Sequence, residues 1–376
     1  MLDIAEHLHH WCEEGRDFAV ATVVSVHGSA PRQPGAALAV DTAGTAVGSV
    51  SGGCVEGAVY DLCREALESG RGRCERFGYA DEDAFAVGLT CGGEIEILIV
   101  PVRSGDPGRP VYEAALAAAA RGEPTALARP LDGTPGALLV RPDGSSVGTL
   151  GRSPALDRTA AAETAALLSA GRTGVLAPGA DGTRCGERTV LLVESSLPPP
   201  RLIVFGAIDF AAALVRVGKF LGHHVTVCDA RPVFATPARF PDADEVVVDW
   251  PHRYLDTQTL DPRTALCVLT HDEKFDIPLL KRALRLPIAY VGAMGSHRTH
   301  TTRLTHLRTA GLTDTELSRL HSPIGLDLAG RTPEETALSI AAEIVAVRRG
   351  GTGAPLTGAG VPIHRGVEES GAVTFR

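Results

Sequence analysis

The first hundred residues show a pattern of apolar positions that changes between strand spacing and helix spacing. Phe18–Val26 (FAVATVVSV) is a continuous β-branched and apolar run, which predicts a strand. A hairpin is expected over 36–50, across the turn residues DTAG. Apolar positions in Val55–Ser69 recur at helical spacing, and the run Glu94–Val100 predicts another strand. The chain therefore begins with a mixed α/β segment.

The stretch 125–197 repeats this pattern in a degenerate form. PGAALAVDTAGTAVGSV at 34–50 resembles PGALLVRPDGSSVGTL at 135–150. The two copies differ at the loop that follows. The first copy has Ser51-Gly52-Gly53-Cys54, whereas the second has Gly151-Arg152-Ser153-Pro154. Because the scaffold is repeated and this loop is not, the chemistry is expected in the first copy.

Beyond a proline-rich linker at Leu197–Pro200, short apolar strands alternate with helices. That alternation is typical of a Rossmann-like, doubly wound parallel sheet. The last helix is expected over Pro333–Arg348, because Thr332 and Glu335 form a capping box at its start. The α/β chain is thus expected to comprise an N-terminal domain at 1–196 with two pseudo-repeats (about 1–103 and 104–196), a Rossmann-like domain at 201–349 and a flexible tail at 350–376.

Composition and charge exclude several kinds of protein. The net charge is −9 and Lys and Arg form no cluster, so no nucleic-acid partner is expected. The start of the chain does not resemble a signal peptide and no run of 18 apolar residues exists, so no membrane association is expected. The eight cysteines are scattered and form no CxxC pair. They indicate reduced thiols in the cytoplasm rather than a disulfide framework or a structural zinc site.

Two cysteines beside glycines are the main candidates for chemistry. The segment Ser51-Gly52-Gly53-Cys54 opens a predicted helix, where backbone N–H groups bind anions and glycines admit a ligand. A thiol at such a position is favoured as thiolate, with a pKa lowered to roughly 3.5–7.5. Cys91, followed by Gly92 and Gly93, precedes a strand and is the weaker candidate. The alternative for both cysteines is a structural thiol at a tight turn.

Further candidate ligand-binding residues lie on loops. Arg32 lies beside prolines and suits a phosphate or a pterin edge, with an ordinary surface arginine as the alternative. Gly206 and Asp229 end successive strands of the Rossmann half, where an acid in the second position holds ribose hydroxyls of a dinucleotide. Ile208, however, replaces the glycine that lets the backbone approach a pyrophosphate. A standard NAD site is therefore not expected.

Polar loops follow later strands of the same half. His271 lies on one of them, and Gly295, Ser296 and Arg298 lie on another. Ligands of such sheets bind outside the carboxyl ends of the strands, although a structural histidine is the alternative for any single one. Asp229, His271, Ser296 and Arg298 are expected to close a cofactor site from across an interdomain cleft.

These motifs together resemble the XdhC/CoxI family of xanthine dehydrogenase accessory factors. The N-terminal part of the resemblance carries GSAPRQPGA, GSVSGGCVEG and LTCGGEIEI. The C-terminal part carries LTHDEKFDIPLL, YVGAMGSHRT and HSPIGLDLAGRTPEETALSIAAEI. The resemblance covers roughly residues 5–103 and 201–348. The sequence departs from the family at Gly206–Phe210, where GAIDF replaces a turn that bears glycine and histidine.

The resemblance implies a homodimeric chaperone rather than an enzyme. Such a protein binds and shields molybdenum cofactor (molybdopterin), helps a cysteine desulfurase to sulfurate it, and inserts it into a molybdenum hydroxylase apoenzyme of the xanthine dehydrogenase or CO dehydrogenase type. Cys54 and Cys91 are its candidate sulfur-relay or molybdenum-contacting thiols. The candidate cofactor-binding residues are Arg32, Ser51, Gly52, Gly53, Gly92, Gly93, Gly206, Asp229, His271, Gly295, Ser296 and Arg298. Two alternatives stay open: an NAD(P)-dependent oxidoreductase and a cysteine-based sulfur-transfer enzyme.

Overall fold

A computed structural model describes residues 1–28, 32–78, 93–179 and 189–357 of the chain. The described residues divide into two compact units, one at Met1–Pro198 and the other from Pro199 onward. Within the described ranges, no helix is long and apolar enough to cross a membrane. Each unit is considered by itself.

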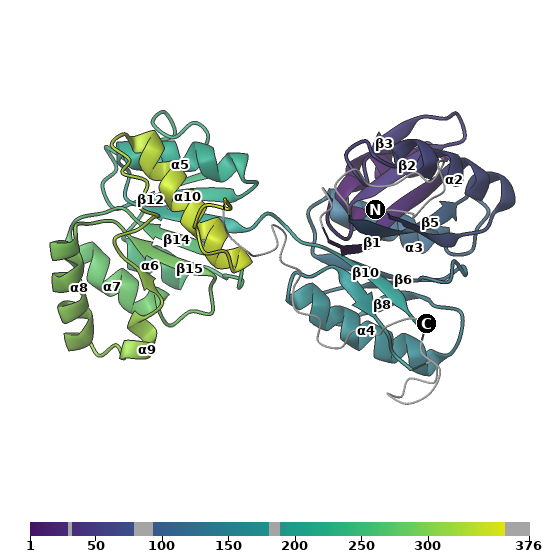
Figure 1. The fold of residues 1–376 in the computed structure, drawn as a ribbon. Helices are drawn as coiled ribbons and strands as arrows, with labels where there is room; N and C mark the ends of the chain where they lie inside the picture. The colour runs from purple at the N-terminus through teal and green to yellow at the C-terminus, as the bar shows by residue number, and fades with distance from the viewer. Residues whose placement is uncertain (29–31, 79–92, 180–188, 358–376) are drawn as a thin grey trace. The chain divides into compact units, whose positions relative to one another are not determined.

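The N-terminal unit contains two five-stranded sheets of the same topology (Figure 1). The first has the order β3-β2-β1-β5-β4, and the second has the order β8-β7-β6-β10-β9. The strands of the first are β1 (Phe18–His27), β2 (Ala37–Asp41), β3 (Ala46–Gly48), β4 (Arg73–Phe77) and β5 (Glu94–Val102). Those of the second are β6 (Thr125–Pro130), β7 (Ala137–Val140), β8 (Ser146–Thr149), β9 (Gly174–Leu176) and β10 (Leu191–Ser196). The internal repeat seen in the sequence is thus a repeat of sheet topology.

Two glycines at matching positions show why the hairpins need small residues. Gly48 and Gly148 both have positive φ, at 86° and 100°. A Cβ at Gly48 would lie 2.2 Å from the carbonyl oxygen of Ala37, and one at Gly148 would lie 2.3 Å from that of Ala137. Each hairpin therefore requires glycine for conformation and for space.

The helices of this unit bury the apolar faces of both sheets. They are η1 (Leu2–Ile4), α1 (Ala5–Glu13), α2 (Glu56–Ser69), α3 (Arg109–Ala120) and α4 (Pro154–Ser169). η1, α1 and α3 share one core with residues of both sheets, whereas α2 packs on the first sheet and α4 on the second. A smaller cluster, centred on Val24, Leu98 and Leu192, joins the inner strands of the two sheets. The two copies therefore form one unit with a shared interior.

The C-terminal unit is built on one parallel sheet with the order β13-β12-β11-β14-β15-β16. Its strands are β11 (Arg201–Phe205), β12 (His224–Asp229), β13 (Glu245–Val248), β14 (Ala265–Val268), β15 (Tyr290–Ala293) and β16 (Leu320–His321). When these six strands are numbered 1 to 6 along the chain, their order in the sheet is 3-2-1-4-5-6, which is the order of a Rossmann sheet. The strand order reverses between β11 and β14, and this is the switch point of the sheet.

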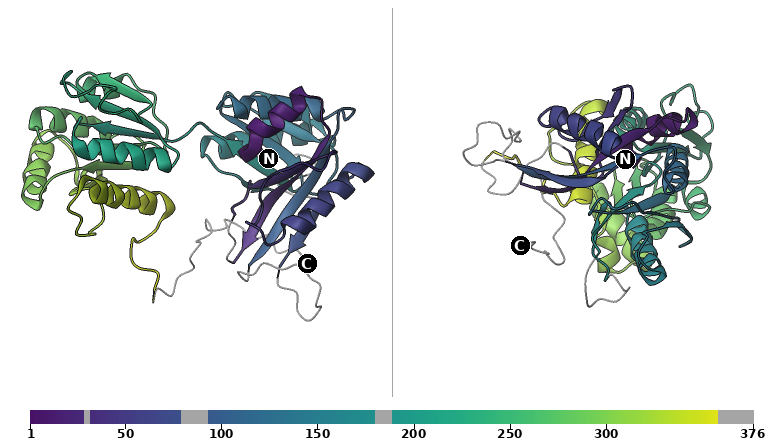
Figure 2. Two further views of the ribbon diagram at one scale, coloured as in Figure 1. Left: turned by 90° about the horizontal axis from the view of Figure 1, so that it is seen from above. Right: turned by 90° about the vertical axis from the view of Figure 1, so that its right-hand side faces the viewer.

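Helices cover both faces of this parallel sheet, as Figures 1 and 2 show. α5 (Asp209–Phe220) and α10 (Pro333–Arg349) bury one face, and α6 (Pro251–Asp256), α7 (Glu273–Ala283), α8 (His297–Thr309) and α9 (Asp314–Leu317) bury the other. α10 begins with the expected capping box of Thr332 and Glu335. The predicted fold class is confirmed: an α/β chain with a repeated N-terminal α/β part and a doubly wound C-terminal sheet.

Candidate functional site

The segment Ser49–Val55, which we call the thiol loop, joins β3 to α2 and carries Cys54. Gly52 and Gly53 have φ values of 75° and 119°, in the region that favours glycine. Both glycines are exposed, and a Cβ at Gly53 would meet nothing within 4 Å. The loop therefore needs glycine there for its backbone conformation, and its surface is open to a ligand.

Glu56, the first residue of α2, holds this loop together. Its carboxylate accepts hydrogen bonds from the Ser49 hydroxyl at 2.7 Å, the Ser51 N–H at 2.9 Å and the Gly53 N–H at 2.7 Å. The Ser51 hydroxyl donates to it as well. The N–H of Gly52 donates instead to the hydroxyl of Ser49, at 3.0 Å. The backbone N–H groups that the sequence offered to an anionic ligand are thus used inside the loop.

These contacts also set the charge of Glu56. Burial by itself would raise the pKa of its carboxyl, but the hydrogen bonds from Ser49 and Ser51 outweigh it and lower that pKa to about 2. Glu56 is therefore a fixed negative charge at neutral pH. An acidic group in the first turn also suits the positive end of the dipole of α2.

Cys54 is half-buried and packs against the core beneath α2. It precedes the N-cap residue Val55, so it lies just outside the helix that it was expected to open. The other described cysteines lie in environments that disfavour a thiolate. Burial raises the pKa of the Cys12 thiol to about 11, raises those of Cys63, Cys74 and Cys228 to about 12, and raises that of Cys267 further.

Of the segment Cys91–Gly93, only Gly93 is among the described residues. Cys91 and Gly92 lie outside the described residues, as does Cys185 of the second copy. Gly93 is buried and directly precedes β5. The structure consequently gives no distance between Cys91 and the thiol loop.

The second copy retains the loop but carries no thiol in it. Its loop runs from β8 into α4, where Ser153 is the N-cap and accepts the N–H of Leu156 at 3.1 Å. Asp157 accepts the N–H of Leu150 at 2.9 Å and the hydroxyl of Thr149 at 2.8 Å. An acid on the helix therefore secures the loop in both copies.

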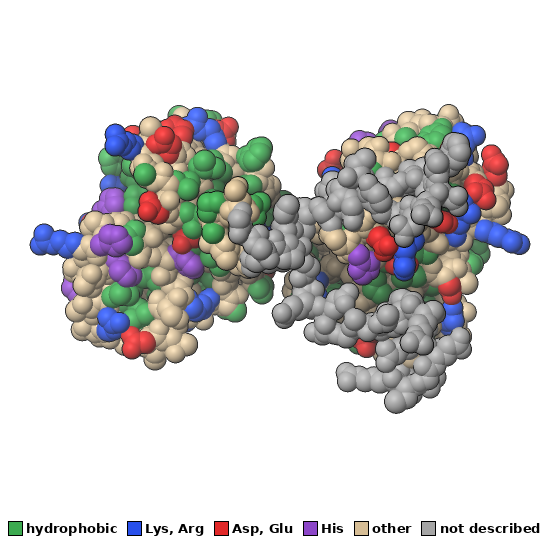
Figure 3. Space-filling view, viewed as in Figure 1, with side chains coloured by type: hydrophobic (Ala, Val, Ile, Leu, Met, Phe, Trp, Pro, Cys, Tyr) green, Lys and Arg blue, Asp and Glu red, His purple; other side chains and the backbone are tan. Residues whose placement is uncertain are grey.

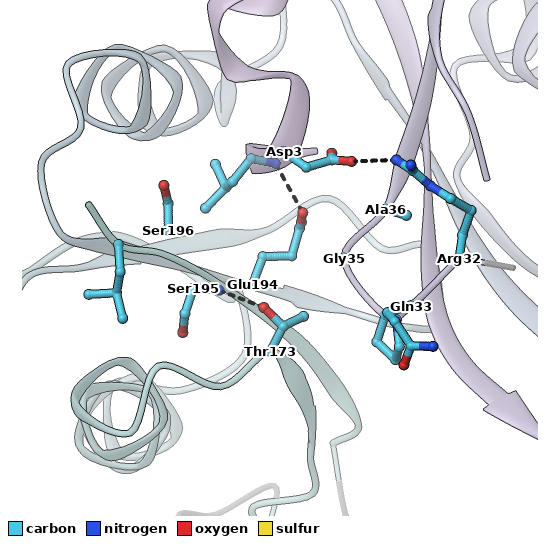
Figure 4. Close-up of a pocket in the computed structure, with 12 residues that line it drawn as sticks. Asp3, Arg32, Gln33, Gly35, Ala36, Thr173, Glu194, Ser195 and Ser196 are labelled. Atoms are coloured by element: carbon cyan, nitrogen blue, oxygen red, sulfur yellow. Dashed lines mark hydrogen bonds and ion pairs between the residues drawn. The ribbon is translucent and has the colours of Figure 1, made fainter. Parts of the chain in front are cut away.

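Arg32 lines a cavity of about 510 Å³ within the N-terminal unit (Figure 4). Half-exposed, it forms an ion pair with Asp3 at 3.5 Å. Across the cavity lie polar groups of the second copy, including Thr173, Ser195 and the carboxylate of Glu194. All lining residues are described, and Cys54 is not one of them. The thiol loop begins near the wall of this cavity, because the N–H of Ser49 donates to the carbonyl of Ala37 at 2.8 Å and Ala36 lines the cavity.

Beneath that cavity lies a buried charged cluster that sequence reasoning missed. Arg129 and Glu194 are 1% and 2% exposed and form an ion pair. Glu194 also pairs with the terminal amine of Met1 and accepts the N–H of Leu2 at 3.1 Å. The sequence does contain an indication of this buried pair, because one charged residue interrupts each of the otherwise apolar strands TALARP and LLVESS.

In the C-terminal unit, Gly206 and Asp229 lie where the dinucleotide motif predicts. Gly206 has φ of 113°, and a Cβ there would lie 3.0 Å from the backbone nitrogen of Thr270. Asp229 is 1% exposed, and its carboxylate accepts the Ala207 N–H at 2.8 Å and is held on both oxygens by Arg231. The acid that would hold a ribose is therefore already engaged within the protein.

His271 and Arg298 line a second cavity, of about 220 Å³, at the carboxyl edge of β14 and β15. Ser296 is the N-cap of α8, accepting the Thr299 N–H at 3.2 Å. Gly295, just before it, has φ of 152°. The structure thus brings these residues to one edge of the parallel sheet.

The polar floor of this cavity was not predicted. Asp276 and Arg303 are 3% and 4% exposed and pair at 3.1 Å. Arg303 also donates to the Ser322 hydroxyl at 3.0 Å and to the Met294 carbonyl at 2.9 Å. Burial is the largest influence on Asp276 and raises the pKa of its carboxyl. Both residues lie inside helices, where sequence alone does not distinguish a buried ion pair from a solvated one.

The distribution of charged side chains and of potential metal ligands adds to this description. On the face seen in Figure 3, Lys and Arg side chains are dispersed rather than gathered in one patch. Among the described residues, no group of three or more His, Cys, Asp or Glu could hold a metal ion.

Comparison with known protein families gives two matches. A family model described as the XdhC and CoxI family matches residues 11–78, which include the thiol loop. A model described as the XdhC Rossmann domain matches residues 202–344, which include the cavity at His271. Together the two models cover more than half of the chain.

Individual relatives extend over nearly the whole sequence. A protein of Bacillus subtilis (strain 168), named as a probable xanthine dehydrogenase subunit, is 26% identical over 337 residues, which are 90% of this chain and 95% of the relative. The molybdenum cofactor insertion chaperone PaoD of Escherichia coli (strain K12) is 28% identical over 334 residues, 89% of this chain and 84% of the relative. A crystal structure described as a xanthine dehydrogenase from Bacillus halodurans shares the fold, with a TM-score of 0.69, 23% identity and coverage of 93% of this chain and 96% of that one.

Proposed function

Because the chain belongs to the XdhC and CoxI family, we propose that it is an accessory protein that binds molybdenum cofactor and inserts it into a molybdenum hydroxylase. The similarity to a molybdenum cofactor insertion chaperone supports this role, since it covers 89% of the chain and so includes parts of both units. The relative named for xanthine dehydrogenase is consistent with a hydroxylase as the recipient. The cofactor is then the cargo of the protein.

The observation that carries this proposal is the setting of Cys54. The thiol lies beside two exposed glycines on a loop within the segment matched by the XdhC and CoxI model. A thiolate is a soft ligand, suited to a sulfur-ligated metal, and the cargo carries molybdenum on a dithiolene. Because the N–H groups of Ser51 and Gly53 already bond to Glu56, the loop offers the cargo the thiol of Cys54 and the open faces of the glycines.

Other predicted contacts remain part of the proposal. Arg32 supplies a cation for the phosphate or the pterin edge of the cargo. His271 and Arg298, at the cavity of the Rossmann sheet, offer a second polar surface to it. Cys91, with its adjacent Gly92 and Gly93, is proposed as a second thiol near the cargo.

Membership of the family is also the basis on which we propose how the cargo is sulfurated and where the protein acts. Cys54 either contacts the terminal sulfur of the cargo or relays sulfur from a cysteine desulfurase. In the relay, its thiolate would attack the outer sulfur of the desulfurase persulfide, form a persulfide on Cys54 and release the desulfurase cysteine as a thiolate. The protein acts as a homodimer in the cytoplasm, where it meets the hydroxylase apoenzyme of the xanthine dehydrogenase or CO dehydrogenase type.

The test is to identify what copurifies with the full chain. Protein prepared without oxygen is expected to carry a pterin and molybdenum, measured by mass spectrometry and elemental analysis. NAD in the protein instead would favour the oxidoreductase alternative, and a persulfide without metal would favour sulfur transfer.

A variant pair connects the cargo with the thiol. Cys54→Ala is expected to lower molybdenum and pterin occupancy by about tenfold, the effect of losing one ligand or an interaction of similar strength. Cys12→Ala removes another half-buried thiol of the same unit and serves as the control. Equal occupancy in the two variants would mean that Cys54 is not a contact of the cargo.

A further inference from the structure

In each copy of the N-terminal unit, an acidic residue in the first turn of the helix accepts hydrogen bonds from the preceding strand end or loop. In the second copy, Asp157 reaches back to the Leu150 N–H at 2.9 Å and the Thr149 hydroxyl at 2.8 Å. Both donors belong to the end of β8 or to the residue after it. This acid therefore does no more than fasten the strand end to the helix.

In the first copy the matching carboxylate holds more of the loop. Glu56 accepts the hydroxyl of Ser49, which corresponds to Thr149, at 2.7 Å. It then takes the N–H and the hydroxyl of Ser51 and, at 2.7 Å, the N–H of Gly53. The additional donors all lie between the strand end and Cys54, the segment in which the two copies differ.

Cys54 is fixed from both sides by these contacts. On one side the Gly53 N–H bonds to Glu56, and on the other the Val55 N–H bonds to the Ser51 hydroxyl at 3.0 Å. Ser51 is itself held by Glu56 and is 1% exposed. Two consecutive glycines with positive φ would otherwise leave this segment with great conformational freedom. Side-chain tethers of this kind are what orient a group that must meet a ligand.

We propose that Glu56 is a positioning residue for Cys54, one whose carboxylate maintains the loop conformation in which the thiol meets the cargo. The proposal rests on the proposed function for the identity of the cargo. The positioning itself is measurable on the thiol without any cargo. Glu56 takes the place that an anionic group of the cargo would otherwise occupy at the Ser51 and Gly53 N–H groups.

The experiment compares Glu56→Gln with Asp157→Asn in the full chain. Each substitution keeps the size of the side chain and removes its charge, but only the first acts on a loop with a thiol. The rate of alkylation of Cys54 by iodoacetamide at pH 7 is followed by peptide mass spectrometry. Molybdenum and pterin occupancy is measured on the same preparations.

Glu56→Gln is expected to raise the alkylation rate of Cys54 by about tenfold, because the loop loosens and a negative charge beside it is lost. Cargo occupancy is expected to fall by about tenfold in the same variant, because the more reactive thiol is no longer oriented. General damage to the fold would also raise the alkylation of Cys63, which is fully buried in the core beneath α2, so unchanged labelling of Cys63 in the same peptide map separates positioning from such damage. Asp157→Asn should leave both quantities within about twofold of the wild type, the usual range for a site remote from them.

Two results would overturn the proposal. One is an alkylation rate of Cys54 in Glu56→Gln within about twofold of the wild-type rate. The other is an equal rise of the Cys54 alkylation rate in Asp157→Asn. If Glu56→Gln does not fold, Ser49→Ala removes one donor to the same carboxylate, with Thr149→Val as its counterpart in the second copy. Alkylation is then expected to rise by roughly threefold in the first of these alone, and no difference between them contradicts the proposal. A wild-type protein that carries no cargo refutes the proposed function, while the alkylation comparison still decides the positioning.

Discussion

Arg129 and Thr22 occupy matching positions in the two copies of the N-terminal unit, and their side chains meet. Thr22 on β1 pairs with Ala37 of β2. In the second copy, Ala128 of β6 pairs with Leu138 of β7, so the next residue, Arg129, lies opposite Ala137, the counterpart of Ala37. The Nη2 atom of Arg129 donates to the Thr22 hydroxyl at 2.9 Å. The interior between the copies is therefore not symmetric. One copy contributes a small hydroxyl and the other contributes a charge that needs a partner.

Removing Arg129 should strongly destabilise the protein. Its guanidinium pairs with Glu194 in the interior, and loss of one member of a buried pair leaves the other charge uncompensated. We expect Arg129→Ala to lower the free energy of unfolding by about 3 kcal/mol, measured by urea denaturation. Arg121→Ala, which breaks an exposed pair with Glu123, is the control and should leave the free energy of unfolding nearly unchanged, because exposed ion pairs are screened by solvent. Similar losses in the two variants would contradict the buried role.

The hairpin glycines offer a comparison of conformation with space. Gly48 and Gly144 both have positive φ, but a Cβ meets a backbone oxygen at 2.2 Å only in the first case, and nothing within 4 Å in the second. We expect Gly144→Ala to cost about 1 kcal/mol of stability from backbone strain alone. Gly48→Ala should cost about 3 kcal/mol, because the paired strands must also separate. Thermal denaturation of the two variants checks the order, and the reverse order would be inconsistent with the structure.

Cysteine reactivity should be uneven along the chain. Burial raises the pKa values of Cys12, Cys63 and Cys74, so these thiols hold little thiolate at neutral pH. Among the described cysteines, we expect Cys54 to be alkylated first at pH 7, as determined by mapping of labelled peptides. Labelling of Cys12 ahead of Cys54 would rule out the thiol loop as the reactive site.

The contribution of Glu56 to stability should depend on pH in a defined direction. Its pKa in the folded protein is lowered from 4.5 to about 2. The stability that it contributes is therefore fully present above its unfolded value and is lost as the pH falls through the folded value. The difference in unfolding free energy between wild type and Glu56→Gln should be constant above about pH 5 and shrink toward pH 2. Denaturant titrations at several pH values measure it, and a difference that grows on acidification would contradict this assignment.

Nucleotide affinity should remain weak even after an obvious repair. Ile208→Gly restores the glycine that the dinucleotide motif lacks, but Asp229 stays bonded to Ala207 and Arg231. We therefore expect no tight NAD binding by either protein in calorimetry. Micromolar affinity in the native chain would instead support the oxidoreductase alternative.

Much of the architecture could be predicted from local patterns. The spacing of apolar residues predicted most strands of the first copy and most of the Rossmann strands, because each buries a face with its own period. β4, with the sequence RCERF, was not predicted, since it is a polar strand at the edge of the first sheet as the described residues form it. β15 lies two residues beyond the predicted run at 288–291, because its start is set by pairing with β14.

The sequence by itself also determined which loop differs between the two copies, because their comparison isolates Cys54 and its glycines, the thiol that we propose for the chemistry, without any coordinates. Only the tertiary structure decided what the neighbouring groups do. The N–H groups of the thiol loop and the carboxylate of Asp229 looked available to a ligand, yet each has a partner within the protein. The reason is physical: polar groups pair with whichever donors and acceptors the folded chain brings within reach, and the sequence does not state which of several nearby ones will meet in space.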